Sequence, residues 1–298
     1  MNNVEMLTRL IPEHDYLIAI DSDGCVFDTM EIKHKECFIP NIIKSWDLQA
    51  ISKYVRSAAE YVNLYSKWRG VNRFPALVKV FDLLKEWPEV QKRQVIIPRV
   101  SALRDWIKRE TKLSNLTLKA EVDRTGDQEL KTTLEWSVAV NDSVLEMVHG
   151  VPPFPNVRAS LSKISDFADI IVCSATPGDA LVREWKEHKI DRNVKVIAGQ
   201  ELGSKAEHIK LATAGKYNFQ KILMIGDAPG DLIAARANKA KFYPINPGSE
   251  EESWREFLST ALERFINGEY NDDYEAQLIN NFEQKLPETP PWLAKDST

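Results

Sequence analysis

Short apolar runs alternate with segments of helical periodicity over much of the chain, and this alternation predicts an α/β fold. The first run is Tyr16–Ile20, and four more follow after residue 150, at 170–173, 194–198, 222–225 and 240–243. Runs of this length and composition are typical of strands buried on both faces of a parallel sheet. Helical segments follow between them, at 157–164, 178–188, from 205 onward and at 232–238. They would provide right-handed crossovers between parallel strands.

A long helical insertion separates the first predicted strand from the second. Between residues 30 and 150, apolar residues recur at three- and four-residue spacing, and we expect helices at 48–65, 77–87, 101–110 and 127–148. No clear alternating strand pattern occurs in this region. Its five tryptophans fit a helical core better than a stacking platform for a ligand; they are Trp46, Trp68, Trp87, Trp106 and Trp136.

The sequence therefore predicts two domains, as its length of 298 residues also suggests. Residues 1–29 and 151–298 would form a Rossmann-like α/β core, and residues 30–150 a helical domain inserted after the first strand. Several prolines between Val151 and Pro155 mark a stiff connector back to the core. Residues 249–286 look like an acidic helical extension of the core, and 287–298 like a tail on the surface.

Composition narrows the functional class. The net charge is −5 at pH 7, which argues against a nucleic-acid-binding surface. No apolar run is long enough for a transmembrane helix, and the first residues lack the pattern of a secretion signal. Three cysteines without metal-ligand spacing indicate free thiols in a reducing cytoplasm. We expect a cytoplasmic protein, monomeric or homodimeric, that acts on a small molecule.

Two carboxylates directly follow the first predicted strand, in the sequence Asp21-Ser22-Asp23-Gly24. Ligands of open α/β sheets bind beyond the carboxyl ends of the strands, so this turn lies where chemistry is usually done. Two anions this close repel each other and are tolerated if a cation neutralises them or if one stays protonated. A hard divalent cation, above all Mg²⁺, fits oxygen ligands. The alternative is an ordinary Asp/Gly turn after a strand.

Other polar residues lie near the carboxyl ends of later strands, and together they match the needs of phosphoryl transfer. Asp21 could attack phosphorus, while Asp23 could protonate the leaving oxygen and later deprotonate water. Asp227 and Asp231 would add carboxylates for Mg²⁺.

Lys205 would neutralise phosphoryl oxygens and Asp21, and the hydroxyl of Ser174 would donate to a phosphoryl oxygen. We prefer Lys205 to its rival Lys210, because Lys205 opens the predicted helix beside the site. For Ser174 the alternative is a hydroxyl that merely caps the strand end.

This ordered set resembles the haloacid dehalogenase (HAD) superfamily of aspartate-nucleophile phosphatases. The family's DxDG motif is similar to residues 21–24, its strand-ending hydroxyl to Ser174, its helix-opening lysine to Lys205, and its GDxxxD motif to residues 226–231. The resemblance covers roughly residues 12–29 and 150–247. It implies that Mg²⁺ is held by the carboxylates of Asp21 and Asp227 and by the backbone carbonyl of Asp23. Asp231 would contribute directly or through a water molecule.

The helical insertion resembles the C1-type cap of the same superfamily, which closes over the site and excludes water. At about 120 residues it is longer than the usual small cap, so known substrate rules need not transfer. Within it, Gly70-Val71-Asn72-Arg73 resembles the specificity loop of β-phosphoglucomutase-like caps. The resemblance implies that Arg73, and less directly Arg69, binds an anionic group of the substrate. The alternative is a solvated basic loop.

The sequence as a whole predicts a Mg²⁺-dependent phosphatase that hydrolyses a small phosphorylated metabolite through an aspartyl-phosphate on Asp21. A phosphomutase of the β-phosphoglucomutase type would use the same residues. A non-catalytic HAD-like binding module is a third possibility. Receiver domains fit less well, because their acidic pair and their phosphorylated aspartate lie on different strands and they carry no large cap. Substrate identity and oligomeric state do not follow from the sequence.

Overall fold

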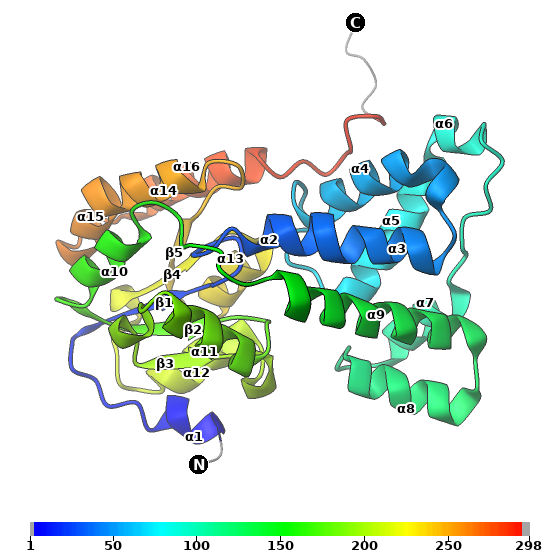
Figure 1. Ribbon diagram of the computed structural model, residues 1–298. Helices are drawn as coiled ribbons and strands as arrows, with labels where there is room; N and C mark the ends of the chain where they lie inside the picture. The colour runs from blue at the N-terminus through cyan, green and yellow to red at the C-terminus, as the bar shows by residue number, and fades with distance from the viewer. Residues whose placement is uncertain (1–2, 294–298) are drawn as a thin grey trace, which may run out of the picture. The chain divides into compact units, whose positions relative to one another are not determined.

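The computed structural model describes residues 3–293 and divides the chain into two compact units. One, the α/β unit, comprises residues up to Met30 and Gly150–Lys285. The other, the helical unit, comprises Glu31–His149 and the segment that begins at Leu286 (Figure 1). None of the helices in the described residues combines the length and the apolar character needed to cross a bilayer.

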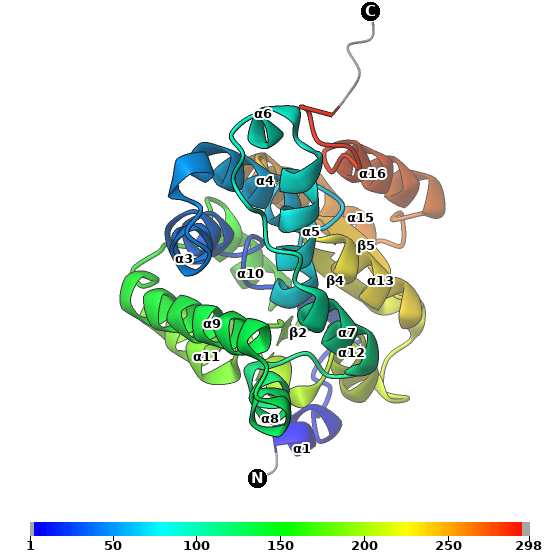
Figure 2. The ribbon, with the colours of Figure 1, turned by 90° about the vertical axis from the view of Figure 1, so that its right-hand side faces the viewer.

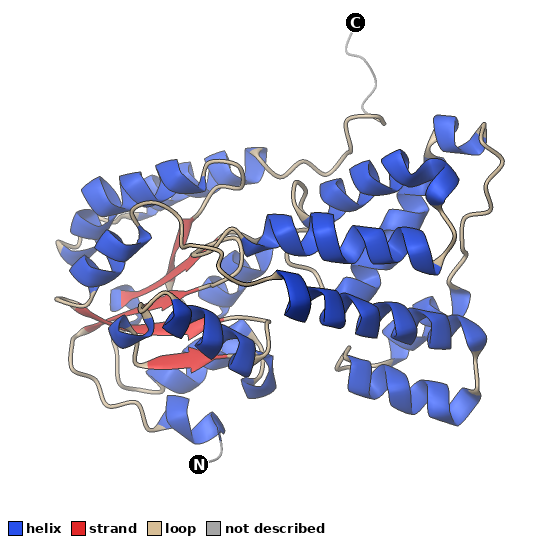
Figure 3. Cartoon of the chain, viewed as in Figure 1, coloured by secondary structure: helices blue, strands red, loops and turns tan. Residues whose placement is uncertain are grey.

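A parallel sheet of five strands forms the centre of the described α/β unit (Figure 3). The strands are β1 (Tyr16–Ile20), β2 (Ala168–Cys173), β3 (Val196–Ala198), β4 (Ile222–Gly226) and β5 (Lys241–Pro244). Their order is β3-β2-β1-β4-β5, so β1 is central and pairs with β2 on one side and β4 on the other. Each predicted strand is present, and its ends differ from the predicted ones by no more than two residues. The α/β prediction is confirmed.

Helices cover both faces of the sheet. The chain order gives α1 (Asn3–Thr8), α10 (Val157–Ile164), α11 (Gly178–Glu187), α12 (Lys205–Thr213), α13 (Pro229–Ala237), α14 (Glu250–Glu256), α15 (Leu262–Ile266) and α16 (Asp272–Gln284). After β1 the chain adds β2 and β3 on one side of it, and then β4 and β5 on the other side. Right-handed crossovers therefore place α10 and α11 on one face of the sheet and α12 and α13 on the other. A π-helical turn, Phe257–Ala261, joins α14 to α15.

The two sheet faces have different cores because side chains alternate along each strand. Ile18 and Ile20 of β1 pack in one cluster with Trp185 of α11 and Trp254 of α14. That cluster also takes in Tyr243 of β5. The acidic extension predicted after residue 249 is therefore helical, and its apolar side chains complete one face of the core.

The helical unit contains α2 (Thr29–Ile32, from its third residue), α3 (Ile39–Ser45), α4 (Ser52–Asn63), α5 (Arg73–Glu86), α6 (Pro88–Gln91), α7 (Ser101–Arg109), α8 (Asn115–Thr125) and α9 (Gln128–Met147). A π-helical turn, Lys33–Phe38, lies between α2 and α3. Figure 2, which turns the ribbon by 90°, brings α8 and α9 to the front. The predicted tryptophan core is present: Trp87, Trp106 and Trp136 are buried in one apolar cluster, and the partly buried Trp46 and Trp68 pack against that cluster.

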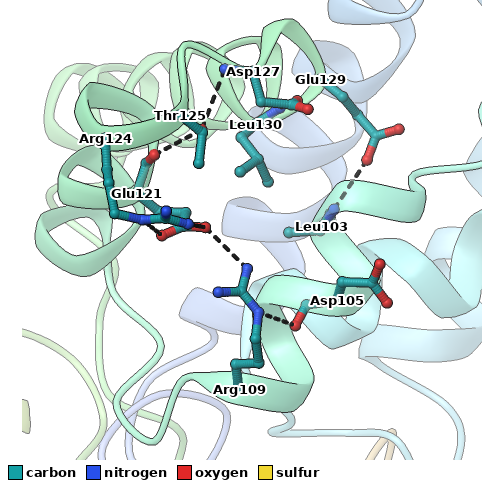
Figure 4. Close-up of polar contacts among 9 residues, drawn as sticks. All are labelled: Leu103, Asp105, Arg109, Glu121, Arg124, Thr125, Asp127, Glu129 and Leu130. Atoms are coloured by element: carbon teal, nitrogen blue, oxygen red, sulfur yellow. Dashed lines mark hydrogen bonds and ion pairs between the residues drawn. The ribbon is translucent and has the colours of Figure 1, made fainter.

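Polar contacts fix α7, α8 and α9 to one another (Figure 4). Glu121 of α8 accepts hydrogen bonds from Arg109 at 2.9 Å and Arg124 at 2.7 Å, and these lower the pKa of Glu121 to about 2. Glu129 of α9 accepts from the amide of Leu103 at 2.9 Å, which satisfies an N–H at the start of α7. Because the arginines of this network are exposed, their ion pairs orient the helices and contribute little to the free energy of unfolding.

The last described residues differ from the expectation. Residues 287–298 were assigned to the core, but the described part of this tail packs within the helical unit. Trp292 stacks on Trp87 with ring centroids 4.0 Å apart, and the Tyr61 hydroxyl donates to the Pro287 carbonyl at 2.9 Å. Trp292 and Leu293 pack against the apolar core of the helical unit, which composition alone does not reveal.

Candidate active site

The polar residues singled out in the sequence lie at the carboxyl edge of the sheet. Asp21 directly follows β1, Ser174 follows β2 and Asp227 follows β4. Because β2, β1 and β4 are neighbours in one parallel sheet, their carboxyl ends bring these three residues to the same edge. The side chains of all three are almost completely buried.

Three carboxylates cluster at this edge. Oxygen atoms of Asp21, Asp227 and Asp231 lie within 4.8 Å of one another. The ammonium of Lys205 contacts two of them, at 2.7 Å from Asp21 Oδ2 and 2.6 Å from Asp231 Oδ1. The structure therefore brings together four of the predicted site residues, and Lys205, not Lys210, provides the cation.

The start of α12 places Lys205 in this contact. Ser204 caps the helix: its hydroxyl accepts from the Glu207 amide, and the Glu207 carboxylate accepts from the Ser204 amide at 2.7 Å. Gly203 precedes the cap with a φ of +117°, a conformation that L side chains rarely adopt. The capped start of the helix thus fixes Lys205 at the first helical position.

The loop after β4 places Asp231. Helix α13 begins at Pro229, three residues earlier than predicted, because proline has a φ suited to the first helical position. Asp231 consequently lies in the first turn, where its Oδ2 accepts from the Ala228 amide at 3.0 Å. Gly226 is required beside it, since a Cβ there would lie 2.3 Å from Asp231 Cγ. The spacing from Gly226 to Asp231 therefore has a steric reason.

The electrostatics of the cluster call for more positive charge. Burial raises the pKa of Asp21, and the carboxylates of Asp231 and Asp227 raise it further, although Lys205 opposes them. Burial alone would lower the pKa of Lys205, but its acidic neighbours outweigh burial and raise it well above the ordinary value. Three buried carboxylates share one ammonium, so a hard cation with oxygen ligands fits this donor set.

Asp23 lies outside the three-carboxylate cluster and is held by two hydroxyls. Thr29 Oγ1 donates to one carboxylate oxygen, and Thr176 Oγ1 donates to the other at 2.5 Å. The motifs in the sequence indicate neither threonine as a partner of Asp23. The signal for Thr176 was its place two residues after Ser174, at the end of the strand next to β1.

Ser174 has a hydroxyl that can act as a donor. Its Oγ accepts from the Thr176 amide at 3.1 Å, and its own amide donates to the Ala198 carbonyl at 3.0 Å. Among the described residues, the Ser174 hydroxyl donates no hydrogen bond, so its proton is available to an oxygen of a ligand.

Arg69 and Arg73 belong to the helical unit and have partners within it. Arg69 is buried and donates to the Leu64 carbonyl at 2.8 Å. Arg73 Nη1 donates to the Ser137 hydroxyl at 2.9 Å and to Asn141 Oδ1 at 2.7 Å. Arg69 is therefore not solvated, whereas Arg73 is partly exposed at the start of α5, and the contact of either residue with a substrate stays a prediction.

The cysteines near the site are not candidate nucleophiles. Cys25 and Cys173 are completely buried, with free thiols. Burial raises the pKa of both thiols, and nearby carboxylates add to this effect. Because the thiolate is the reactive form, both act as small apolar side chains.

Comparison with known proteins gives matches among solved structures alone. No family model matches the chain, and neither does any curated protein. A haloacid dehalogenase-like hydrolase from Streptococcus pneumoniae is 12% identical with a TM-score of 0.48, over 80% of this chain and 90% of its own.

A haloacid dehalogenase-like hydrolase from Xanthomonas campestris is 9% identical with a TM-score of 0.46, over 87% of this chain and 95% of its own. A HAD-superfamily hydrolase from Geobacter sulfurreducens is 11% identical with a TM-score of 0.41, over 78% and 90%. At these levels of similarity the function has to be inferred from the side chains of the chain itself.

Proposed function

We propose that the protein is a Mg²⁺-dependent phosphatase of the HAD type that hydrolyses a small phosphorylated metabolite. The observation that carries the proposal is the buried cluster in which Lys205 contacts Asp21 and Asp231, with Asp227 beside them. A site with carboxylate ligands for a hard cation and an ammonium for phosphoryl oxygens fits phosphoryl transfer.

Asp21, Asp227 and Asp231 would hold Mg²⁺, with the backbone carbonyl of Asp23 as a further ligand expected from the sequence resemblance. Mg²⁺, when bound, neutralises phosphate charge and favours the ionised form of Asp21. The cluster supports a role for this cation, because burial raises the pKa of Asp21. A protonated Asp21 would be a poor nucleophile.

In the reaction, an oxygen of Asp21 forms a bond to phosphorus as the bond to the ester oxygen breaks. Asp23 gives its proton to that leaving oxygen. Asp23 then takes a proton from water as the water oxygen attacks phosphorus, and the bond to Asp21 breaks to release phosphate. The hydroxyls of Thr29 and Thr176 hold the carboxyl group of Asp23 in place for both transfers.

Lys205 and Ser174 would stabilise the negative charge of the phosphoryl oxygens. The Lys205 ammonium is already fixed beside the Asp21 oxygen that would attack, at 2.7 Å. Little reorganisation is then needed when charge develops. The Ser174 hydroxyl would add a hydrogen bond from the neighbouring strand end.

Arg73 is the proposed contact for a second anionic group on the substrate. Its three hydrogen-bond acceptors are uncharged, and among the described residues no carboxylate lies within ion-pair distance of it. Burial lowers its pKa to about 10. A partly buried guanidinium without an acidic partner favours an anionic ligand. Arg73→Met should raise KM about tenfold for such a substrate, the loss of a hydrogen bond to a charged group. An unchanged KM would leave Arg73 a structural residue. For Arg69, a contact with the substrate is proposed from the sequence resemblance alone.

The test is inorganic phosphate release from a panel of phosphorylated metabolites, with Mg²⁺ or with EDTA. Wild-type protein should release phosphate with Mg²⁺ alone, Asp21→Asn should release none, and the exposed-surface control Lys210→Met should match wild type. Turnover that requires a bisphosphate activator and releases little phosphate would establish a phosphomutase instead. A folded protein without turnover of any ester would leave the binding-module alternative.

A further inference from the structure

Both tryptophans of the α/β unit donate a hydrogen bond to the loop that carries Asp21 and Asp23. The indole N–H of Trp185, on α11, donates to the Ser22 hydroxyl at 3.0 Å. The indole N–H of Trp254, on α14, donates to the Cys25 carbonyl at 2.7 Å. Both side chains are completely buried. Two distant segments of sequence therefore converge on residues 22–25.

The loop's own backbone satisfies other groups but not these two. The Ser22 carbonyl accepts from the Val26 and Phe27 amides at 2.8 and 3.1 Å, and the Gly24 amide donates to the Phe27 carbonyl at 2.8 Å. Gly24 has a φ of +74°, which makes this tight turn possible. The buried Cys25 carbonyl obtains a donor from Trp254, and leaving it without one would be costly.

Aromatic contacts hold each indole in its orientation. Trp185 meets Phe27 edge-on with ring centroids 6.0 Å apart, and Trp254 meets Phe257 edge-on at 5.6 Å. A rigid aromatic ring with one polar atom loses little conformational freedom when it donates a hydrogen bond. The Ser22 hydroxyl that accepts from Trp185 also lies 3.5 Å from Glu184 Oε2, toward which it can donate.

The helical unit shows that burying a tryptophan here does not by itself demand such a partner. The indole nitrogens of Trp106 and Trp136 are buried there and have no hydrogen-bond partner among the described residues. In the α/β unit, by contrast, both indoles reach the same short loop. That difference points to a role for the two donors at the loop rather than to aromatic packing alone.

We propose that Trp185 and Trp254 are positioning residues that hold the loop carrying Asp21 and Asp23. Helix α14 of the C-terminal extension thereby helps to position the candidate active site. The catalytic part of this inference rests on the proposed phosphatase function. Asp21 lies on one side of Ser22 and Asp23 on the other, so a shift of the loop moves the nucleophile and the acid/base together. Small displacements of reacting groups reduce turnover strongly.

The first test uses Trp185→Phe and Trp254→Phe, which keep an aromatic ring and remove the N–H. Trp106→Phe is the matched control, because it removes a buried N–H that has no described partner. Amide hydrogen exchange of residues 21–27, followed by mass spectrometry, should become about fivefold faster in both loop variants, as expected for the loss of one hydrogen bond. The control should leave it unchanged. Unaltered exchange in the loop variants would overturn the proposal.

The second test is kinetic, with the best ester from the phosphate-release panel. Each loop variant should lower kcat about fivefold while KM stays within about twofold, because ground-state binding of the ester is retained. A kcat equal to that of Trp106→Phe would refute a positioning role even if exchange were faster. If wild-type protein hydrolyses no ester, the proposed function fails, and the exchange experiment alone decides whether the indoles hold the loop.

A small substitution covers the case in which a tryptophan variant does not fold. Ser22→Ala removes the acceptor of Trp185 and leaves both rings in place. It should accelerate exchange of the loop at least as much as Trp185→Phe, because it also removes the contact with Glu184, and the double variant should be no faster than Ser22→Ala alone. Additive effects of the two substitutions would show that the hydrogen bond does not couple them, and would refute the inference for Trp185.

Discussion

Replacing Lys205 with methionine tests the charge balance on which the candidate active site depends. Methionine is similar in length and has no charge, so the change removes the ammonium and keeps most of the packing. In the wild-type chain, that ammonium lies 2.7 Å from Asp21 and 2.6 Å from Asp231. The variant would leave those two carboxylates and Asp227 buried together at the edge of the sheet.

The expected cost follows from the burial of the partners. Removing one member of a buried ion pair typically costs about 3–5 kcal/mol, because it leaves an uncompensated charge. Two features favour the lower end of this range. The Lys205 side chain is 18% exposed, and Asp21 can relieve repulsion by taking up a proton. We therefore expect the free energy of unfolding of the α/β unit to fall by about 3 kcal/mol when no divalent cation is present.

Hydrogen exchange in EDTA is the suitable assay, because it reports on each of the two compact units separately. Amides of β1 and β4 should exchange through opening of the α/β unit, so their exchange rates report its free energy of unfolding. Lys210→Met is the matched control, since Lys210 lies exposed on the same helix. The control should change the free energy by less than about 0.5 kcal/mol.

Two outcomes would contradict this reasoning. If Lys205→Met and Lys210→Met were equally stable in EDTA, the ion pairs of Lys205 would contribute little. If added Mg²⁺ failed to reduce the difference between wild type and Lys205→Met, the three carboxylates would not form a cation site. The reasoning expects the opposite, because a bound cation would neutralise the charge that the missing lysine leaves behind.

Metal addition, pH and the terminal tail provide three further tests. Mg²⁺ at a hundred times its Kd should stabilise wild-type protein by about 2.7 kcal/mol, and Asp227→Asn clearly less, in thermal or urea unfolding. In EDTA, burial raises the pKa of Asp21, so the folded chain binds its proton more tightly than the unfolded chain. The contribution of Asp21 to the free energy of unfolding is thus greatest at low pH and is lost as the pH rises above the ordinary aspartate pKa, near 3.9. The difference in stability between wild type and Asp21→Asn, measured across a pH series, should follow this trend. Trp292→Ala should lower the free energy of unfolding of the helical unit by about 2 kcal/mol. This is less than for a fully buried tryptophan, because Trp292 is partly exposed. Hydrogen exchange of amides in α4 and α5 measures the change.

The parts of the fold that the sequence predicts are those determined by local pattern. The five strands are short apolar runs bounded by polar residues, so both their number and their parallel orientation follow from alternation with helices. The cluster at the carboxyl edge of the sheet could be predicted from the sequence for the same reason. Asp21 and Asp227 directly follow strands, and Lys205 is the first residue of a capped helix. Each position is set by its own neighbours in the chain.

The parts that the sequence does not predict depend on contacts between distant residues. Thr176 is 153 positions from Asp23, and no local pattern marks it as a partner of that carboxylate. Trp254 is 229 positions from Cys25. The segment after Leu286 packs within the helical unit and not with the predicted core, because its partners Tyr61 and Trp87 are distant in the sequence. Such pairings are set by tertiary packing.

The composition of the cluster argues that it exists for function rather than for stability. Three carboxylates and one ammonium leave an excess of negative charge in a nearly buried position. Replacing a buried ionic group with apolar side chains of similar volume is often neutral or stabilising, so folding alone gives no reason to keep the arrangement. Gly226 is also constrained by Asp231, and the capping box by the placement of Lys205. Local structure therefore holds an arrangement of charges that folding alone does not require.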